Sequence, residues 1–283
     1  MKNLLILLLV IGLTSCKENK TPQKTNVENG TPKLDVDVTI LESDFIKWWT
    51  YHENNILLSS EFIAINDKSE TISKDDFLTS LTTGDYIAVK LVAPDNVKQY
   101  QLYKLSSSAD KQISKTVKLA SEKIYSKYRM EGTPFPDFNF TDLNGKIYTN
   151  DNTKGKTLIF KCWFINCKPC IAEFPELNNF ADEYSKREDV EFISLALDNK
   201  VALDKFLSKK VFKYNTVPNQ EDFIENKLSI NTYPTHIVVN ENGNIEKIVS
   251  KVTELISFIN NGDLLTTNKN VGSPPPPAPP APM

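Results

Sequence analysis

The stretch Leu158-Ile159-Phe160-Lys161-Cys162-Trp163-Phe164-Ile165-Asn166-Cys167-Lys168-Pro169-Cys170 decides the fold. Residues 157–164 are apolar and aromatic enough to predict a buried strand. The helical spacing that follows predicts a helix over residues 168–186. Cys167 therefore lies where a helix begins, and there free backbone N–H groups and the helix dipole favour a thiolate over a thiol. With the positive charge of Lys168 beside it, the pair Cys167 and Cys170 is predicted to be a redox-active dithiol.

The other two cysteines have different predicted roles. Cys162 lies within the predicted strand, where a free cysteine packs as a small hydrophobe. A CxxC pair also occurs in zinc sites, but these need a second ligand pair. The remaining candidates are scattered along the chain (Cys16, Cys162, His52 and His236), so we expect no metal site. Cys167 and Cys170 are instead predicted to form a working disulfide in an exported protein.

The N-terminal residues predict export and a lipid anchor. Residues 1–15 have a basic start and an apolar run, Leu4 to Leu13, that is too short to span a bilayer, as in a signal peptide. Leu13-Thr14-Ser15-Cys16 resembles a bacterial lipobox, which implies lipidation of Cys16; the alternative is an ordinary cleaved signal with an incidental cysteine. Lys17 after Cys16 favours the outer membrane over the inner membrane.

Composition divides the rest of the chain. Residues 16–33 are polar and predict a flexible tether, and the prolines of residues 264–283 predict a disordered tail. Between them we expect a small α+β domain of unknown role over 34–128 and a second domain over 129–263. The net charge of −3 comes with no basic patch, so nucleic acid is not an expected partner.

Periodicity predicts the elements of both domains. In the first, we expect strands at 36–40, 61–65, 85–91 and 100–105, and helices at 43–53 (capped by Ser43), from Ser73, and at 111–128. Trp48, Trp49 and His52 are expected in the core or at a domain interface. In the second, strands at 137–141, 146–149, 157–164, 190–197, 235–240 and 245–249 alternate with helices at 168–186, 202–208, 221–228 and 253–260, and the segment 214–217 has no assigned type. This pattern predicts a mixed sheet covered by helices on both faces.

From Gly132 to the last helix, about half of the chain resembles the TlpA/ResA-type membrane-anchored thiol-disulfide oxidoreductases of the thioredoxin superfamily. Four features in order carry the resemblance. They are Gly132-Thr133-Pro134-Phe135-Pro136-Asp137-Phe138, Trp163 before the first cysteine, the dithiol followed by Glu173, and Tyr233-Pro234-Thr235 before a strand. The resemblance implies a thioredoxin-like α/β fold.

The resemblance also implies roles for individual residues. Cys167 would attack a substrate disulfide and Cys170 would resolve the mixed disulfide. Pro234 would be a cis proline facing the dithiol, and Trp163, Tyr233 and Pro234 would bind substrate. No cofactor is implied.

Three further positions carry expectations of their own. Glu173 is either a dipole-stabilising surface residue or, as the resemblance implies, a partly buried acid that tunes the cysteine pKa values and relays a proton. Lys161 stands where cytoplasmic thioredoxin has a buried aspartate, and we expect its side chain to reach the surface. His236 is interpreted as a strand side chain rather than a catalytic group.

These residues together predict a periplasm-facing lipoprotein of the cell envelope that reduces or exchanges disulfides. Its expected partners are exported proteins carrying disulfides, a membrane electron donor or acceptor, and the membrane itself through lipid on Cys16. The family serves cytochrome c maturation or general disulfide traffic, and antioxidant activity is a further association.

Two alternatives on the same fold stay open. A thiol peroxidase needs Thr or Ser three residues before its reactive cysteine, where this chain has Phe164. A copper-binding metallochaperone would use the soft thiolates of the pair, but related copper proteins have a wider cysteine spacing and a distant histidine.

Overall fold

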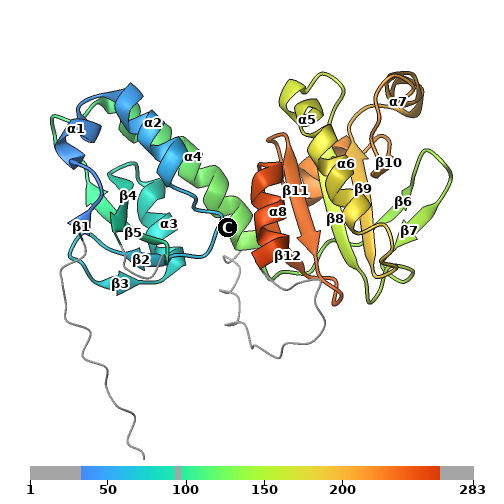
Figure 1. Cartoon of the computed structure of the whole chain (residues 1–283), viewed down its shortest axis with the longest axis horizontal. Helices are drawn as coiled ribbons and strands as arrows, with labels where there is room; N and C mark the ends of the chain where they lie inside the picture. Colours follow the sequence, from blue (N-terminus) through green and yellow to red (C-terminus); the bar gives the residue numbers. More distant parts are fainter. Residues whose placement is uncertain (1–32, 93–96, 262–283) are drawn as a thin grey trace, which may run out of the picture. The chain divides into compact units, whose positions relative to one another are not determined.

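The computed structural model describes residues 33–92 and 97–261 (Figure 1). The signal peptide, Cys16, residues 16–32 of the tether and the proline-rich tail lie outside the described residues. Within the described ranges, no helix has both the length and the apolar character needed to cross a membrane.

The N-terminal block contains a five-stranded sheet of order β1-β4-β5-β2-β3. Its core includes Trp48, Phe77 and Ile87, contributed by two helices and a strand, and Ile113 from a third helix. Helix α4 is the long element that leads out of this block (Figure 1). In chain order the elements are β1 (Lys33–Leu34), α1 (Val38–Glu42), α2 (Phe45–Asn55), β2 (Ile63–Ile65), β3 (Thr71–Ile72), α3 (Lys74–Thr82), β4 (Tyr86–Val92), β5 (Gln99–Lys104) and α4 (Lys111–Met130).

The second block is built on a mixed sheet of order β10-β9-β8-β11-β12. Strand β8 is central and wholly buried, parallel to β9 and antiparallel to β11. The elements are β6 (Asn139–Thr141), β7 (Ile147–Thr149), β8 (Thr157–Trp163), α5 (Lys168–Ala172), α6 (Phe174–Glu183), β9 (Val190–Ala196), α7 (Lys200–Leu207), β10 (Asn215–Val217), the π-helical turn η1 (Phe223–Lys227), β11 (Thr235–Val239), β12 (Ile245–Val249) and α8 (Val252–Asn261).

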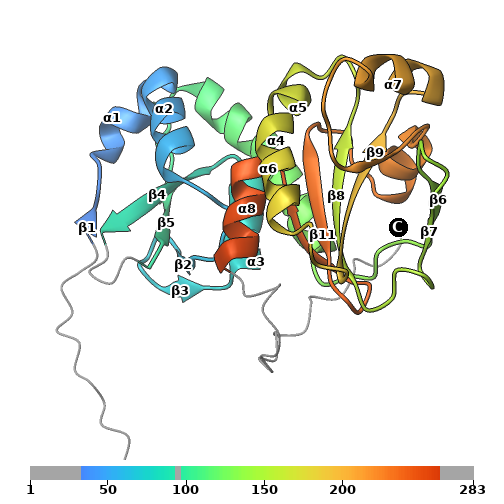
Figure 2. The same cartoon turned by 45° about the vertical axis from the view of Figure 1, so that its right-hand side comes forward.

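Both faces of this sheet are covered. Alternate residues of β8 face opposite sides. Ile159 packs with Leu177 of α6 and Leu255 of α8, whereas Phe160 packs with Phe135 and with Phe223 of η1. Figure 2 shows α6 and α8 together on one side of the sheet. The predicted mixed α/β sheet is confirmed, and it is a thioredoxin-like arrangement.

Three local predictions in the N-terminal block are wrong. Lys33 belongs to β1, paired with Val92, and not to the tether. Residues 38–42 are helical because the Asp37 carboxylate accepts the Thr39 N–H at 3.0 Å, and this cap outweighs the strand propensity of the β-branched residues. Helix α2 is capped by Asp44, not Ser43.

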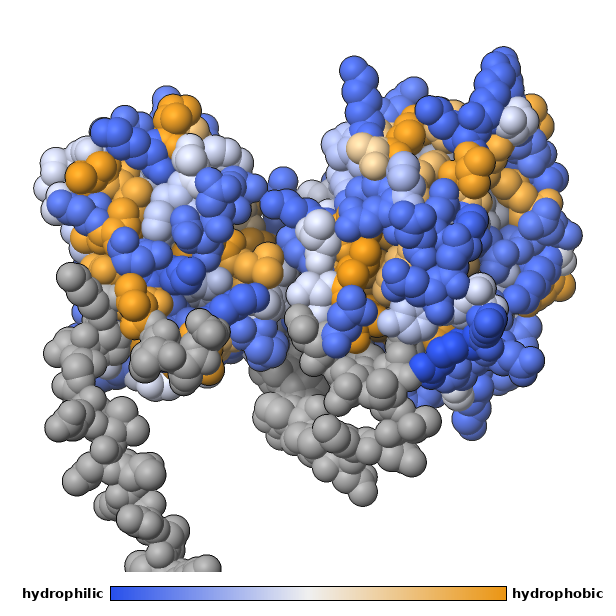
Figure 3. All heavy atoms as spheres, in the orientation of Figure 1, coloured by the Kyte–Doolittle hydropathy of each residue, from blue (hydrophilic) through white to orange (hydrophobic). Residues whose placement is uncertain are grey.

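The aromatic cluster on α2 divides between core and surface. Trp48 is 1% exposed, while Trp49 is 40% exposed. Trp48 is therefore a core residue and Trp49 is not, and a place at a domain interface stays a prediction for Trp49. Figure 3 shows a largely hydrophilic face on which apolar residues form small, separated patches.

Candidate active site

The dithiol lies in the loop that leaves β8 and starts α5. The Cys167 N–H donates to the Phe164 carbonyl at 3.1 Å, and the Ile165 N–H donates to the Asp198 carboxylate at 2.7 Å. Cys167 is the N-cap of α5, and its Sγ accepts the Cys170 N–H at 3.3 Å. Pro169 fits the first turn because that turn needs no N–H from it. The two cysteines form a disulfide with Cα atoms 5.3 Å apart, as predicted.

The two sulfur-bearing residues differ in exposure. Cys167 is 5% exposed and Cys170 is fully buried, within a cluster that includes Trp163 and Phe174. An incoming sulfur atom can therefore reach Cys167 only. This asymmetry fits an attacking Cys167 and a resolving Cys170.

The Tyr233-Pro234 peptide bond is cis, as predicted. Thr235, the next residue, pairs with Cys162 of β8, so Pro234 lies at the end of β8 from which the dithiol loop departs. The Tyr233 ring packs on the disulfide cluster and meets the Phe164 ring edge-on, with centroids 5.4 Å apart. The backbone around Pro234 is thus beside the redox pair.

Trp163 does not fit the predicted contact with substrate. Its side chain is fully buried and packs edge-on against Phe174 at 5.0 Å and Phe212 at 5.8 Å between ring centroids. Trp163 therefore lies beneath the disulfide and supports it.

Glu173 sits where the predicted helix over 168–186 breaks into two. Pro175 at the start of α6 lacks the N–H that would continue α5 and its ring obstructs the preceding turn, so the helix kinks here. The break leaves Glu173 as C-cap of α5 and N-cap of α6. Its carboxylate turns inward with 13% of the side chain exposed, which confirms the partly buried position.

The Glu173 carboxylate has three hydrogen-bond partners from three elements. Oε2 is 2.6 Å from the Lys161 ammonium and 3.1 Å from His236 Nε2, while Oε1 accepts the Val252 N–H at 3.0 Å. Burial alone would raise the pKa of Glu173, but the bond to His236 and the charge of Lys161 together lower it. The lowered pKa keeps the carboxylate ionised near neutral pH, and the proton relay through Glu173 stays a prediction.

Lys161 does not reach the surface, and that expectation is wrong. The residue is 0% exposed, and burial lowers the pKa of its ammonium group while Glu173 opposes the shift. Strand alternation turns Lys161 to the same face as Trp163, and cross-strand pairing sets it opposite His236. At the position of the buried aspartate expected from cytoplasmic thioredoxin, this chain therefore has Lys161, which forms an ion pair with Glu173.

His236 is a strand residue, as predicted, but it also belongs to this cluster. Its Nε2 contacts Glu173, whereas its Nδ1 is buried without a hydrogen-bond partner among the described residues. Nε2 is therefore assigned the proton that it donates to the carboxylate. Burial lowers the pKa of His236 and keeps the ring neutral near pH 7.

Cys162 is a buried free thiol, as predicted for a core residue. Burial raises its pKa to about 12, which makes the thiolate inaccessible at neutral pH. In the described ranges 33–92 and 97–261, no three His, Cys, Asp or Glu side chains are grouped as metal ligands.

Sequence reasoning missed three contributors to the site: Lys161, His236 and Asp198. Strand alternation placed Lys161 on the Trp163 face, which was an available signal. The other two contributors depend on tertiary structure. The register between β8 and β11 sets His236 opposite Lys161, and the loop after β9 brings the Asp198 carboxylate to the Ile165 N–H.

Comparison with known proteins places this site in a family. Residues 132–248 match the AhpC/TSA family. Thiol-disulfide oxidoreductase ResA from Bacillus cereus is 30% identical over 125 residues, covering 44% of this chain and 72% of the relative. ResA from Geobacillus kaustophilus is 28% identical over 120 residues, covering 42% of this chain and 68% of the relative.

Among solved structures, StoA from Bacillus subtilis matches over 43% of this chain and 93% of its own, with 24% identity and a TM-score of 0.39. The AhpC/TSA match lies in the block that contains the sheet around β8 and the Cys167–Cys170 disulfide. The chain belongs to the family of ResA-type thiol-disulfide oxidoreductases.

Proposed function

We propose that this protein is a thiol-disulfide oxidoreductase of the cell envelope that reduces or exchanges disulfides in exported proteins. The observation that carries the proposal is the Cys167–Cys170 disulfide at a helix N-cap, with Cys167 5% exposed, Cys170 fully buried and the cis Pro234 loop beside the pair. The relatives' names describe the same chemistry.

The reaction has two exchange steps. In the reduced protein, the Cys167 thiolate attacks one sulfur of a substrate disulfide, forming a mixed disulfide and releasing the other substrate sulfur as a thiolate that takes a proton from water. The Cys170 thiolate then attacks Cys167 Sγ, which releases the second substrate thiol and closes the Cys167–Cys170 bond. The substrate gains two electrons and two protons, and the protein loses them. A membrane electron donor restores the dithiol.

The cis Pro234 loop supplies the binding element for a polypeptide substrate. Backbone groups of Tyr233 pair with an extended chain, as in strand addition. This pairing is independent of substrate sequence, so it fits general disulfide traffic among exported proteins as well as cytochrome c maturation.

The proposed location depends on the N-terminal residues. Lipid on Cys16, after removal of residues 1–15, would hold the catalytic block at the membrane through the tether, and Lys17 favours the outer membrane. The apolar run Leu4 to Leu13 and the lipobox-like Leu13-Thr14-Ser15-Cys16 support this proposal.

Trapping of mixed disulfides tests the proposed reaction. Cys170→Ser removes the resolving sulfur, so we expect envelope proteins to accumulate in mixed disulfides with Cys167, detectable on non-reducing gels. Cys167→Ser should trap almost none, because Cys170 is buried. Equal trapping by the two variants would overturn the assignment of roles, and an absence of trapping in both, with no insulin reduction by the wild type, would overturn the activity.

A further inference from the structure

Lys127 of helix α4, in the N-terminal block, forms hydrogen bonds beside the active-site loop. The Lys127 ammonium donates to Ser250 Oγ at 2.7 Å and to Thr235 Oγ1 at 3.2 Å. Thr235 directly follows the cis proline and is fully buried. Its hydroxyl donates to the Thr232 carbonyl at 2.7 Å. The Thr235–Thr232 bond closes a turn around Tyr233 and Pro234, and Lys127 donates to the same hydroxyl oxygen.

The end of α4 is fixed against β12, so Lys127 has a defined position. The Glu131 carboxylate accepts the Lys247 ammonium at 3.0 Å and the Ile248 N–H at 3.3 Å. Gly132 and Thr133 then exchange backbone hydrogen bonds with Ile245 at 2.7 and 2.8 Å. Both ends of the lysine side chain are thereby held, one by the helix and one by the hydroxyls.

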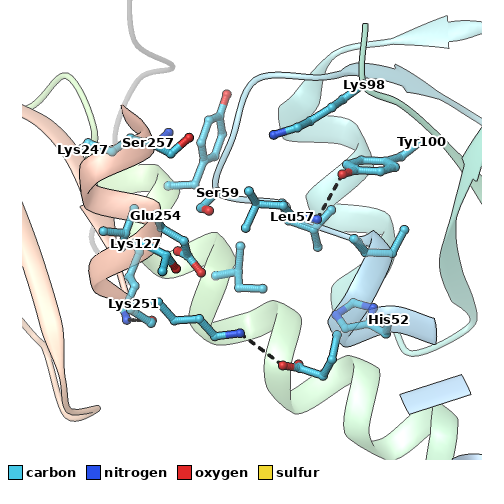
Figure 4. Close-up of a pocket in the computed structure, with 18 of the residues that line it drawn as sticks. His52, Leu57, Ser59, Lys98, Tyr100, Lys127, Lys247, Lys251, Glu254 and Ser257 are labelled. Atoms are coloured by element: carbon cyan, nitrogen blue, oxygen red, sulfur yellow. Dashed lines mark hydrogen bonds and ion pairs between the residues drawn. The ribbon is translucent and has the colours of Figure 1, made fainter. Parts of the chain in front are cut away.

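Lys127 borders a cavity of about 680 Å³ on this side of the molecule. In Figure 4, Lys127 and Glu254 lie side by side in this cavity, with Lys251 nearby. Burial lowers the pKa of Lys127 to about 8, although Glu254 opposes the shift. Burying an ammonium group is costly unless hydrogen bonds compensate it, so its bonds to Ser250 and Thr235 contribute more than an exposed lysine's would.

We propose that Lys127 is a positioning residue by which the N-terminal block holds the Tyr233-Pro234 loop in the conformation that receives a polypeptide substrate. The proposal rests on the proposed oxidoreductase function. Lys127 precedes residues 132–248, the segment matched by the family, so this support comes from a part of the chain outside the match. It assigns the N-terminal block a role in substrate binding.

The first test measures the loop itself and needs no activity. In the full-length protein, Lys127→Met keeps the length of the side chain and removes its hydrogen-bond donors. We expect faster hydrogen exchange in the peptide containing residues 230–236, and unchanged exchange in β8 and α6. Lys115→Met is the matched control, since Lys115 is exposed on the same helix. Exchange equal to that of the wild type would overturn the proposal.

The second test measures how Lys127 affects the KM for a polypeptide substrate. Lys127→Met should raise KM for a disulfide-containing peptide about tenfold, the order expected for loss of the charged hydrogen bond from Lys127 to Thr235. The value of kcat and the rate with a small organic disulfide should not change. Lys127→Arg should recover part of the affinity. An equal loss for peptide and small disulfide would overturn the proposal. A wild type inactive with both substrates would instead overturn the proposed function, and the exchange measurement would still decide the role of Lys127.

Discussion

At the scale of single residues, Glu173 links β8, β11 and the start of α8 through one carboxylate. Glu173→Gln would leave the Lys161 ammonium buried without its counter-charge. We therefore expect the free energy of unfolding, measured in urea, to fall by about 3–5 kcal/mol. The double variant Lys161→Met/Glu173→Gln should recover most of this loss. If the two substitutions instead destabilise additively, the ion pair is not what holds the cluster together.

The chain has two histidines, and both have lowered pKa values in the folded state, chiefly through burial. On acidification, the unfolded state takes up protons near pH 6.5 before the folded state does. Stability is therefore present above that pH and is lost as the pH falls toward the folded pKa values, by at most about 1.4 kcal/mol per pH unit for each histidine.

The variant His236→Gln tests this pH dependence. It keeps a donor for Glu173 and removes the titration, so its unfolding free energy should fall less between pH 7 and pH 5 than that of the wild type. His52→Gln is the parallel variant in the other block. A slope unchanged by both substitutions would mean that neither imidazole is buried as a neutral ring.

At the scale of elements, the caps decide where helices begin. Asp44 Oδ1 accepts the N–H groups of Ile46 and Lys47 at 2.9 and 3.1 Å, while the Ser43 hydroxyl donates backward to the Ile40 carbonyl. Asp44→Ala should lower the free energy of unfolding by about 1 kcal/mol, and Ser43→Ala should lower it by clearly less. Thermal unfolding followed by circular dichroism measures both variants. A larger loss of stability in Ser43→Ala than in Asp44→Ala would show that Ser43 is the N-cap.

Elements with strong local sequence signals could be predicted. Elements where strand propensity and helix capping favour different structures could not. The buried strand β8, the helix start at Ser73 and the long helix α4 follow from patterning that tertiary contacts reinforce. Residues 36–40 have the β-branched pattern of a strand, yet the Asp37 carboxylate caps a helix over residues 38–42. The break at Glu173 had a visible cause in Pro175, whereas the partners of Glu173 come from strands whose register the sequence does not contain.

At the scale of the whole molecule, the proposed lipid on Cys16 and the catalytic block are separate parts of the chain. Cys16→Ala should therefore move the protein out of the membrane fraction and leave insulin reduction unchanged. Membrane flotation with labelled palmitate, compared between wild type and variant, measures this. A wild type that carries no label and does not float would contradict the anchor.

The slight exposure of Cys167, 5% of the residue, has a consequence for timing in the envelope. A cysteine residue this little exposed is more easily reached by disulfides that protrude, such as those on unfolded chains or extended loops. Once a client has folded around its own disulfide, that bond is out of reach. We therefore expect the protein to react faster with disulfides in unfolded chains than with the same disulfides in folded proteins, which stopped-flow reaction with a client before and after folding measures.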